Sequence, residues 1–230
     1  MLRKILFASS LFFCSIATAS ATTCPSVSSS TTVTSSCSTG IIWTGGNLTI
    51  GTSSSSISIT NTTDVAAIEA NGRSLGFLTN KANNTIGDGA TGNAIQNDSD
   101  SVIRRIYNYG SLIAENSVWN DGTITALYNY GSISSTNGGI WNNAGSINTI
   151  YNIGSITVGG GANGVYNNAL ISTLNNRGSI TVGNIGTGIA NGGSGIITTL
   201  NNSGSITVGS TGGGGSWGIS NGGTISTLNN

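Results

Sequence analysis

The sequence of this chain has few of the residues on which most enzymes and nucleic-acid-binding proteins depend. It contains no histidine, one proline (Pro25) and only 6% charged residues. Without histidine, neither a histidine-dependent catalytic triad nor a histidine-ligated metal site can form. Low charge and many glycines could indicate disorder, but disorder needs a shortage of core formers and usually a high net charge. The regularly spaced isoleucines and leucines and the scarcity of proline therefore argue against it.

Ionisable side chains are especially rare in the second half of the chain. From residue 122 onward, tyrosines apart, the only one belongs to Arg177. Enzymes that cleave polysaccharides need clustered carboxylates or basic groups for acid and base catalysis. We therefore predict that the chain is not an enzyme and uses no cofactor or metal.

Acidic residues are grouped around two arginines, Arg104 and Arg105, in the middle of the chain. One interpretation is a calcium or sugar site on early coils. The other, which we favour, is a solvated face, because the aspartates lack the spacing of a calcium-binding loop. The acidic residues are Asp98, Asp100, Glu115 and Asp121.

The N-terminus has the three-part pattern of a secretory signal peptide. Arg3 and Lys4 precede an apolar stretch, and small residues around Ala19 and Ala21 offer a cleavage site. The apolar stretch is too short to span a bilayer, for which about 20 residues are needed. We predict a signal peptide over residues 1–21, and hence an exported protein.

Removal of residues 1–21 leaves five basic and seven acidic residues. This charge balance excludes a nucleic-acid footprint and a polybasic membrane patch. Two cysteines remain, Cys24 and Cys37, and in an exported chain they predict a disulfide. No feature of the sequence defines an oligomer.

A repeat of the form Gly-x-Ile-x-x-Leu-x-Asn-x-Gly-Ser-Ile begins near residue 101. The spacings between successive second glycines are 21, 23, 24 and 26 residues. A β-solenoid accepts such variation, because extra residues bulge out as loops while the short strands stay in register. We predict an all-β fold, a right-handed parallel β-helix with coils of about 21–26 residues. The second glycines are Gly110, Gly131, Gly154, Gly178 and Gly204.

Apolar positions in each repeat predict three short strands per coil. Two stacks point into the core on one side, three residues apart, so a bend or bulge is expected between them. Their members are Ile103, Ile124, Ile147, Ile171 and Ile197, followed by Ile106, Leu127, Ile150, Leu174 and Leu200. A third side carries an apolar residue with an asparagine two places later, as in Ile95 and Asn97.

An asparagine follows two residues after each member of the second stack. Asparagine tolerates the left-handed conformation, so we place these residues at a coil corner, with the glycine two places on providing a second bend. Stacked asparagines can also bond along the solenoid axis as a ladder. The predicted ladder contains Asn108, Asn129, Asn152, Asn176 and Asn202.

Four regions follow from these patterns. Residues 1–21 are the signal peptide, residues 22–40 are a Ser/Thr-rich leader or N-terminal cap, and residues 41–100 are degenerate coils. Residues 101–230 are the regular repeats, which stop in mid-repeat. Because an uncapped strand edge is a feature that natural proteins avoid, we expect a fragment or a truncated gene product.

Aromatic residues align in successive repeats. Tyr107, Tyr128 and Tyr151 form one outward file, and Tyr109 and Tyr130 lie beside it. Such a stripe is either a contact surface for glycans or a partner protein, or a stabilising ladder between coils. We favour the structural role, because stacking between like aromatic side chains is reason enough for the pattern.

The signal peptide followed by units such as Leu174-Asn175-Asn176-Arg177-Gly178-Ser179-Ile180 resembles the passenger region of bacterial autotransporters, the type V secreted outer-membrane proteins. The resemblance covers roughly residues 41–230. It implies a passenger displayed on, or released from, the outer membrane, often adhesive, with a C-terminal β-barrel translocator. That barrel is absent from this sequence.

Two other functions remain as alternatives to a surface adhesin. One is a free-standing secreted module that binds ice or carbohydrate, suggested by the outward residues Thr157, Thr181 and Thr207. The variable coil length argues against the even array that ice requires. The other is a secreted carbohydrate-active enzyme, which the missing acid and base groups disfavour.

Overall fold

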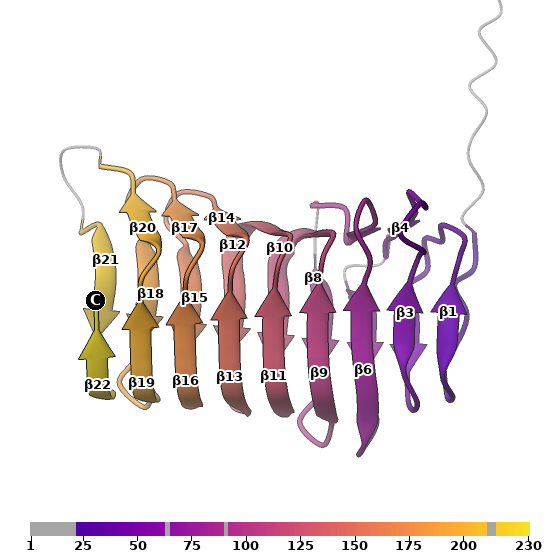
Figure 1. The fold of residues 1–230 in the computed structure, drawn as a ribbon, viewed down its shortest axis with the longest axis horizontal. Coiled ribbons are helices and arrows are strands. Elements are labelled where there is room, and N and C mark those ends of the chain that lie inside the picture. Colours follow the sequence, from indigo (N-terminus) through magenta and orange to yellow (C-terminus); the bar gives the residue numbers. More distant parts are fainter. Residues whose placement is uncertain (1–21, 63–64, 90–91, 211–214) are drawn as a thin grey trace, which may run out of the picture.

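The computed structural model describes residues 22–62, 65–89, 92–210 and 215–230, which contain strands and turns but no helix. The predicted signal peptide lies outside the described residues. The chain winds into a right-handed parallel β-helix, as predicted. In Figure 1 the front strands point upward, those behind point downward, and successive coils advance from right to left.

One side of the β-helix is a nine-stranded parallel sheet, here called sheet 1. At about 4.8 Å between neighbouring strands, its nine strands span about 38 Å along the axis. They are β1 (Thr31–Val33), β3 (Leu48–Ile50), β6 (Leu75–Asn80), β9 (Val102–Asn108), β11 (Thr123–Asn129), β13 (Ser146–Asn152), β16 (Leu170–Asn176), β19 (Ile196–Asn202) and β22 (Thr224–Asn229).

The remaining strands form a branched thirteen-stranded sheet, sheet 2, which has two faces. The Gly-Ser-Ile face contains β4 (Ser58–Ile59), β7 (Thr85–Ile86), β14 (Ser155–Val158), β17 (Ser179–Val182) and β20 (Ser205–Val208). The third face contains β2 (Ile41–Trp43), β5 (Ala66–Ala70), β8 (Asn93–Asn97), β15 (Asn163–Asn167), β18 (Thr187–Asn191) and β21 (Trp217–Asn221).

Two long strands join these faces. In β10 (Ser111–Asn120) and β12 (Ser132–Asn142) the second and third sides of the coil are continuous, with a shift of register between Ala114 and Asn116. The predicted three separate strands per coil therefore hold for the later coils, where inserts divide the two faces. They do not hold for these two coils.

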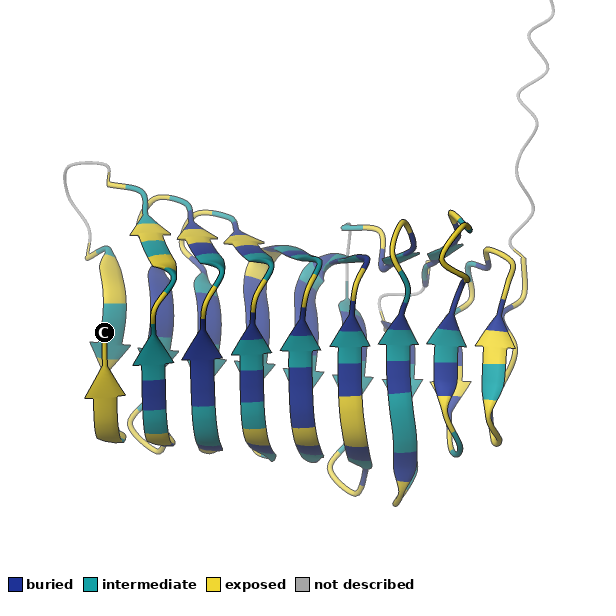
Figure 2. Cartoon of the chain, in the orientation of Figure 1, coloured by how far each residue is buried: buried dark blue, intermediate teal, exposed yellow. Residues whose placement is uncertain are grey.

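The predicted apolar stacks form the core. Ile103, Ile124 and Ile147 pair in register and are completely buried, as are Leu127 and Ile150. The expected irregularity between the stacks lies inside the longer strands of sheet 1: β9, for example, buries Ile103 and Ile106 but exposes the two residues between them. The buried bands cross the strands in Figure 2.

The predicted asparagines form a buried ladder along the axis. The side-chain Nδ2 of Asn108 donates to Oδ1 of Asn129 (2.8 Å) and also to the backbone oxygen of Ser132 (3.0 Å). Both amide protons are thus used within a low-dielectric interior, where an unpaired polar group is costly. The ladder begins at Asn80 and runs through Asn108, Asn129, Asn152, Asn176, Asn202 and Asn230.

A second buried ladder lies at the corner between the third face and sheet 1. Its donor-acceptor distances are 2.7 to 2.8 Å, and it runs through Asn97, Asn120, Asn142, Asn167, Asn191 and Asn221. The first members, Asn80 and Asn97, have no donor for Oδ1. The reason is that their register partners one coil earlier, Ile50 and Ala70, have no side-chain amide to donate a hydrogen bond.

The predicted conformation of the corner residues was wrong. Asn83 and Ile185 are the only described residues besides glycine with a positive φ, so the ladder asparagines are not left-handed. The repeat glycines do not have a positive φ either. They are needed for close approach, because a Cβ on Gly131 would lie 2.1 Å from the backbone oxygen of Gly110.

The first coil is closed by the N-terminal segment. A disulfide joins Cys24 and Cys37, both of which are buried. Residues 22–40 are more than a leader, because they include β1, the first strand of sheet 1, and bury Val27 and Val33 in the core.

Candidate functional site

The most organised exposed side chains are five tyrosines, here called the tyrosine stripe. Tyr107, Tyr128 and Tyr151 occupy equivalent outward positions on β9, β11 and β13, and neighbouring ring centroids are 5.2 and 5.6 Å apart. Tyr109 and Tyr130 lie in the turns that follow these strands, with ring centroids 4.9 Å apart. These turn residues are 43% and 41% exposed.

The ring planes of the stripe are nearly parallel. Angles between stacked neighbours are 4 to 13°, both between coils and within a coil. Tyr107, Tyr128 and Tyr151 form the inner file of the stripe. At one end of this file, Phe77 packs edge-on with Tyr107, and at the other the guanidinium of Arg177 lies over Tyr151 at 5.9 Å. The ring faces of Tyr107, Tyr128 and Tyr151 are therefore covered by neighbours, which favours for these three residues the structural role that the sequence suggested.

The packing of the stripe affects its acid-base behaviour. Partial burial raises the pKa of the Tyr130 hydroxyl, with smaller contributions from Tyr109, Tyr128 and Tyr107, in that order. A phenolate at Tyr130 would be less well solvated and would lie near the other phenols, so its protonated form is favoured.

Three arginines border the stripe. Arg104 and Arg105 lie over the ring of Phe77 at 5.8 and 5.5 Å, and Arg105 donates a hydrogen bond to the Tyr107 hydroxyl (3.4 Å). Arg177 occupies the turn position that Tyr130 has two coils earlier. The backbone N–H of each donates to the backbone oxygen of a ladder asparagine in the preceding coil. The sequence alone did not connect these arginines with the tyrosines, because the turns and strands that carry them meet only in the folded coil.

Asparagines continue the stripe toward the C-terminus. Asn175 pairs in register with Tyr151, and Asn201 and Asn229 follow. The Nδ2 of Asn201 donates to Asn175 and that of Asn229 to Asn201, at 2.8 and 2.7 Å. This third, outward ladder was missed, although the replacement of tyrosine by asparagine at one repeat position was visible in the sequence.

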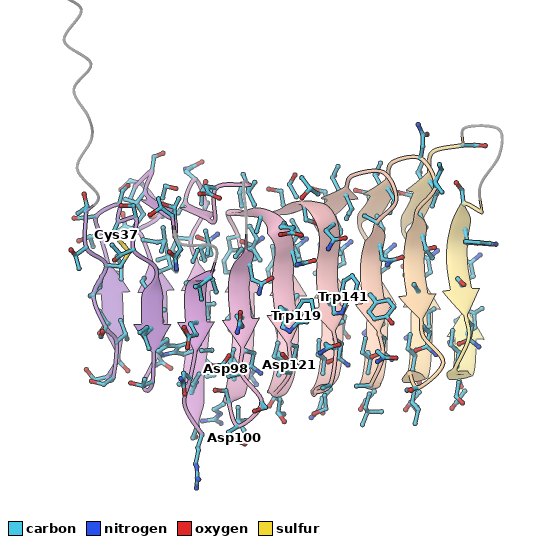
Figure 3. The ribbon with its side chains drawn as sticks, turned by 180° about the vertical axis from the view of Figure 1, so that it is seen from behind. Cys37, Asp98, Asp100, Trp119, Asp121 and Trp141 are labelled. Atoms are coloured by element: carbon cyan, nitrogen blue, oxygen red, sulfur yellow. A yellow bond between two sulfur atoms is a disulfide. The ribbon has the colours of Figure 1, made fainter. Side chains whose placement is uncertain are left out.

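A second aromatic file lies on the third face, on the far side of the molecule (Figure 3). Trp119 and Trp141 stack with centroids 5.5 Å apart, and Tyr166 extends the file at 4.3 Å from Trp141. The indole N–H of Trp119 donates to Asp121 (2.7 Å). Asn143 donates to the other oxygen of that carboxylate (2.8 Å), so this aspartate orients its neighbours.

The acidic residues do not form a metal site. Asp98, Asp100 and Asp121 line a shallow depression together with Asn71 and Ser99, and Gln96 donates to Asp98 (3.0 Å). In the part of the chain that the structure describes, no group of three or more metal-ligating side chains comes together. Glu115 lies apart from them, on β10.

Comparison with known proteins gave no match to a protein-family model, to a curated protein or to a solved structure. The described residues also include no helix long and apolar enough to cross a membrane. The fold and its surface are therefore the basis for any functional assignment.

Proposed function

We propose that this chain is an exported, non-enzymatic β-helix scaffold that presents an adhesin-like binding face at the cell surface or in the medium, as the passenger region of an autotransporter does. The observation that carries the proposal is the exposed pair of the tyrosine stripe, Tyr109 and Tyr130. Tyr109 and Tyr130 are held more than 40% exposed (43% and 41%) on a frame with an almost completely buried core. Large exposed aromatic side chains in fixed positions are typical of binding surfaces.

Two features support export. The pattern of residues 1–21 is that of a signal peptide. The disulfide between Cys24 and Cys37 belongs to an oxidising compartment, because cytosolic thiols are kept reduced.

The composition supports a scaffold rather than a catalyst. A coil held by two buried asparagine ladders needs few charges for stability, and residues 122–230 offer only Arg177 besides tyrosines. General acid and base chemistry needs clustered carboxylate or basic groups, which residues 122–230 do not supply.

Expression of the full gene in a Gram-negative host tests export. We expect a mature chain that begins after Ala19 or Ala21, found outside the cytoplasm with Cys24 and Cys37 oxidised, as mass spectrometry with and without reduction would show. Substitution Ala19→Arg together with Ala21→Arg should block cleavage, whereas Ala8→Ser should not. An uncleaved, reduced chain in the cytoplasm would contradict the proposal.

Binding is tested separately. The exported chain is applied to a panel of immobilised polysaccharides and matrix proteins, and the bound fraction is compared with that of a Tyr109→Ala/Tyr130→Ala variant. We expect the parent chain to bind at least one surface and the variant to bind it less. Equal retention of the two proteins on every surface would contradict a binding role for the stripe.

Ice binding is a second candidate, favoured by one observation. Thr157, Thr181 and Thr207 pair in register on the Gly-Ser-Ile face, so variable coil length does not disturb their spacing. The argument from coil length was therefore wrong, because the inserts leave the sheet as loops. Thermal hysteresis of the exported chain, compared with a Thr181→Tyr variant, tests this candidate.

A further inference from the structure

Basic residues are concentrated along the border of the tyrosine stripe. Of the five that follow residue 21, Arg104 and Arg105 lie on β9 and Arg177 in the turn after β16. Lys81 lies in the corresponding turn after β6, since its N–H donates to the coil before it, as that of Tyr109 does. Only Arg73 lies elsewhere, in the turn between β5 and β6.

Acidic residues follow the opposite distribution. Of the acidic residues that the structure describes, Glu69 and Glu115 lie on strands of sheet 2, and Asp88 lies between its strands β7 and β8. Asp98, Asp100 and Asp121 lie in turns that follow its third face (Figure 3). Every residue that pairs in register with Arg105 is uncharged, namely Phe77 and Ala126. The rod therefore has a basic, tyrosine-rich border and an acidic side, although its net charge is small.

The orientation of the aromatic rings determines what this border can recognise. In the inner file the faces of Tyr107, Tyr128 and Tyr151 are occupied by neighbouring rings or by Arg177. A sugar ring therefore cannot lie flat on these three rings, which removes the usual mode of recognition for neutral sugars along this file. What remains available is a set of hydroxyl groups and ring edges with exposed guanidinium groups at both ends.

We propose that this border binds an acidic polysaccharide, one that carries carboxylate or sulfate groups, with its chain along the solenoid axis. The inference rests on the proposed function and specifies its ligand class. Guanidinium groups match planar or tetrahedral oxyanions with paired hydrogen bonds, and tyrosine hydroxyls bond the sugar hydroxyls between them. From the coil of Lys81 to that of Arg177 there are four strand spacings, roughly 19 Å, enough for several sugar units.

The exported chain is tested against polygalacturonate, dextran sulfate and neutral dextran, each immobilised, and binding is measured at increasing salt. We expect both acidic polymers to bind and neutral dextran not to bind. Because cations displaced from a polyanion oppose binding, affinity should fall roughly tenfold or more between about 50 and 200 mM salt. Binding to only one acidic polymer would identify the anionic group that is recognised.

Single substitutions locate the site. Arg105→Gln and Arg177→Gln should each weaken binding about threefold to fivefold, the range of an exposed ion pair. Arg73→Gln, which removes the same charge away from the stripe, should leave it within about 1.5-fold on the same scale. Unfolding midpoints of all three variants show whether a loss of binding reflects a loss of folding.

Three results would overturn the inference: equal affinity for neutral dextran, an Arg73→Gln variant as weak as Arg177→Gln, or no retention on either acidic polymer at low salt. If the chain still binds another surface of the panel, the proposed binding role stands and only the ligand class falls. If it binds nothing, both fall.

Discussion

Asn108 and Asn129 are 21 residues apart in the chain, and their side chains are joined by a 2.8 Å hydrogen bond in the completely buried interior. The same bond recurs from coil to coil at two corners of the β-helix. Each amide therefore connects successive coils in the core, where water cannot replace a lost partner.

Replacement of a ladder asparagine should destabilise the β-helix strongly. In Asn129→Ala the donor to Asn152 and Ser155 is lost, and the Nδ2 of Asn108 loses its acceptor. We expect a loss of about 3 kcal/mol, because buried partners are left unpaired. Urea unfolding followed by circular dichroism measures it. Asn148→Ala, at an exposed position of β13, should change little; equal effects would contradict the ladder's role.

Substitution of a repeat glycine should be costly for steric reasons alone. A Cβ at position 131 would lie 2.1 Å from the oxygen of Gly110, part of a backbone that cannot move without disturbing the neighbouring coil. Gly131→Ala should therefore destabilise the chain by about 2 kcal/mol.

Gly193→Ala is the matched control for the glycine prediction. No atom lies within 4 Å of a Cβ built there, and its φ is not positive. We expect its free energy of unfolding to stay within about 0.5 kcal/mol of that of the parent chain. If Gly193→Ala were as unstable as Gly131→Ala, close contact between the backbones of successive coils would not be the cause of the destabilisation.

Loss of the disulfide should act locally. In Cys24→Ser/Cys37→Ser the loop is no longer closed in the unfolded state, and loop entropy predicts a loss of about 3 kcal/mol for its 13-residue separation. Because a solenoid coil contacts mainly its neighbours, the loss should be greatest in the first coils. Hydrogen exchange should accelerate in residues 22–50 and remain slow in residues 123–202. Uniform acceleration would argue against a local cap.

Alkaline pH should weaken the tyrosine stripe. The folded-state pKa of Tyr130 is raised by burial and by its tyrosine neighbours, so the protonated form is favoured in the folded protein. Its contribution to stability is complete below the ordinary tyrosine pKa of about 10, and is lost as pH rises through the higher folded value. Absorbance titration should show one late phenol, absent in Tyr130→Phe. An unchanged titration in that variant would contradict the assignment.

Much of the fold could be predicted from residues that repeat. Ile124, Ile147 and Ile171 recur at one position of the unit and indeed form one buried stack. A polar residue follows each of them, as expected for a strand that turns one face toward the core and the other toward solvent. The ladder of Asn108 and Asn129 followed from the same alignment.

Other features depend on which atoms meet in space. The glycines at positions 110 and 131 do lie at bends, as predicted, but what requires glycine there is that neighbouring backbones almost touch. The orphaned Oδ1 of Asn97 reflects an alanine, Ala70, 27 positions earlier, which pairs with it through a sheet whose early register the worn repeats do not reveal.

The sequence by itself determined the periodicity, and with it the β-helix, the inward stacks and the tyrosine file, because each depends only on which residue recurs. Only the tertiary structure decided the direction in which the rings face, and that Arg105 and Arg177 gather beside them while Asp98 and Asp121 lie along another corner. The physical reason is the coil itself: residues that are neighbours in sequence face different sides, whereas residues one turn apart lie about 4.8 Å from each other.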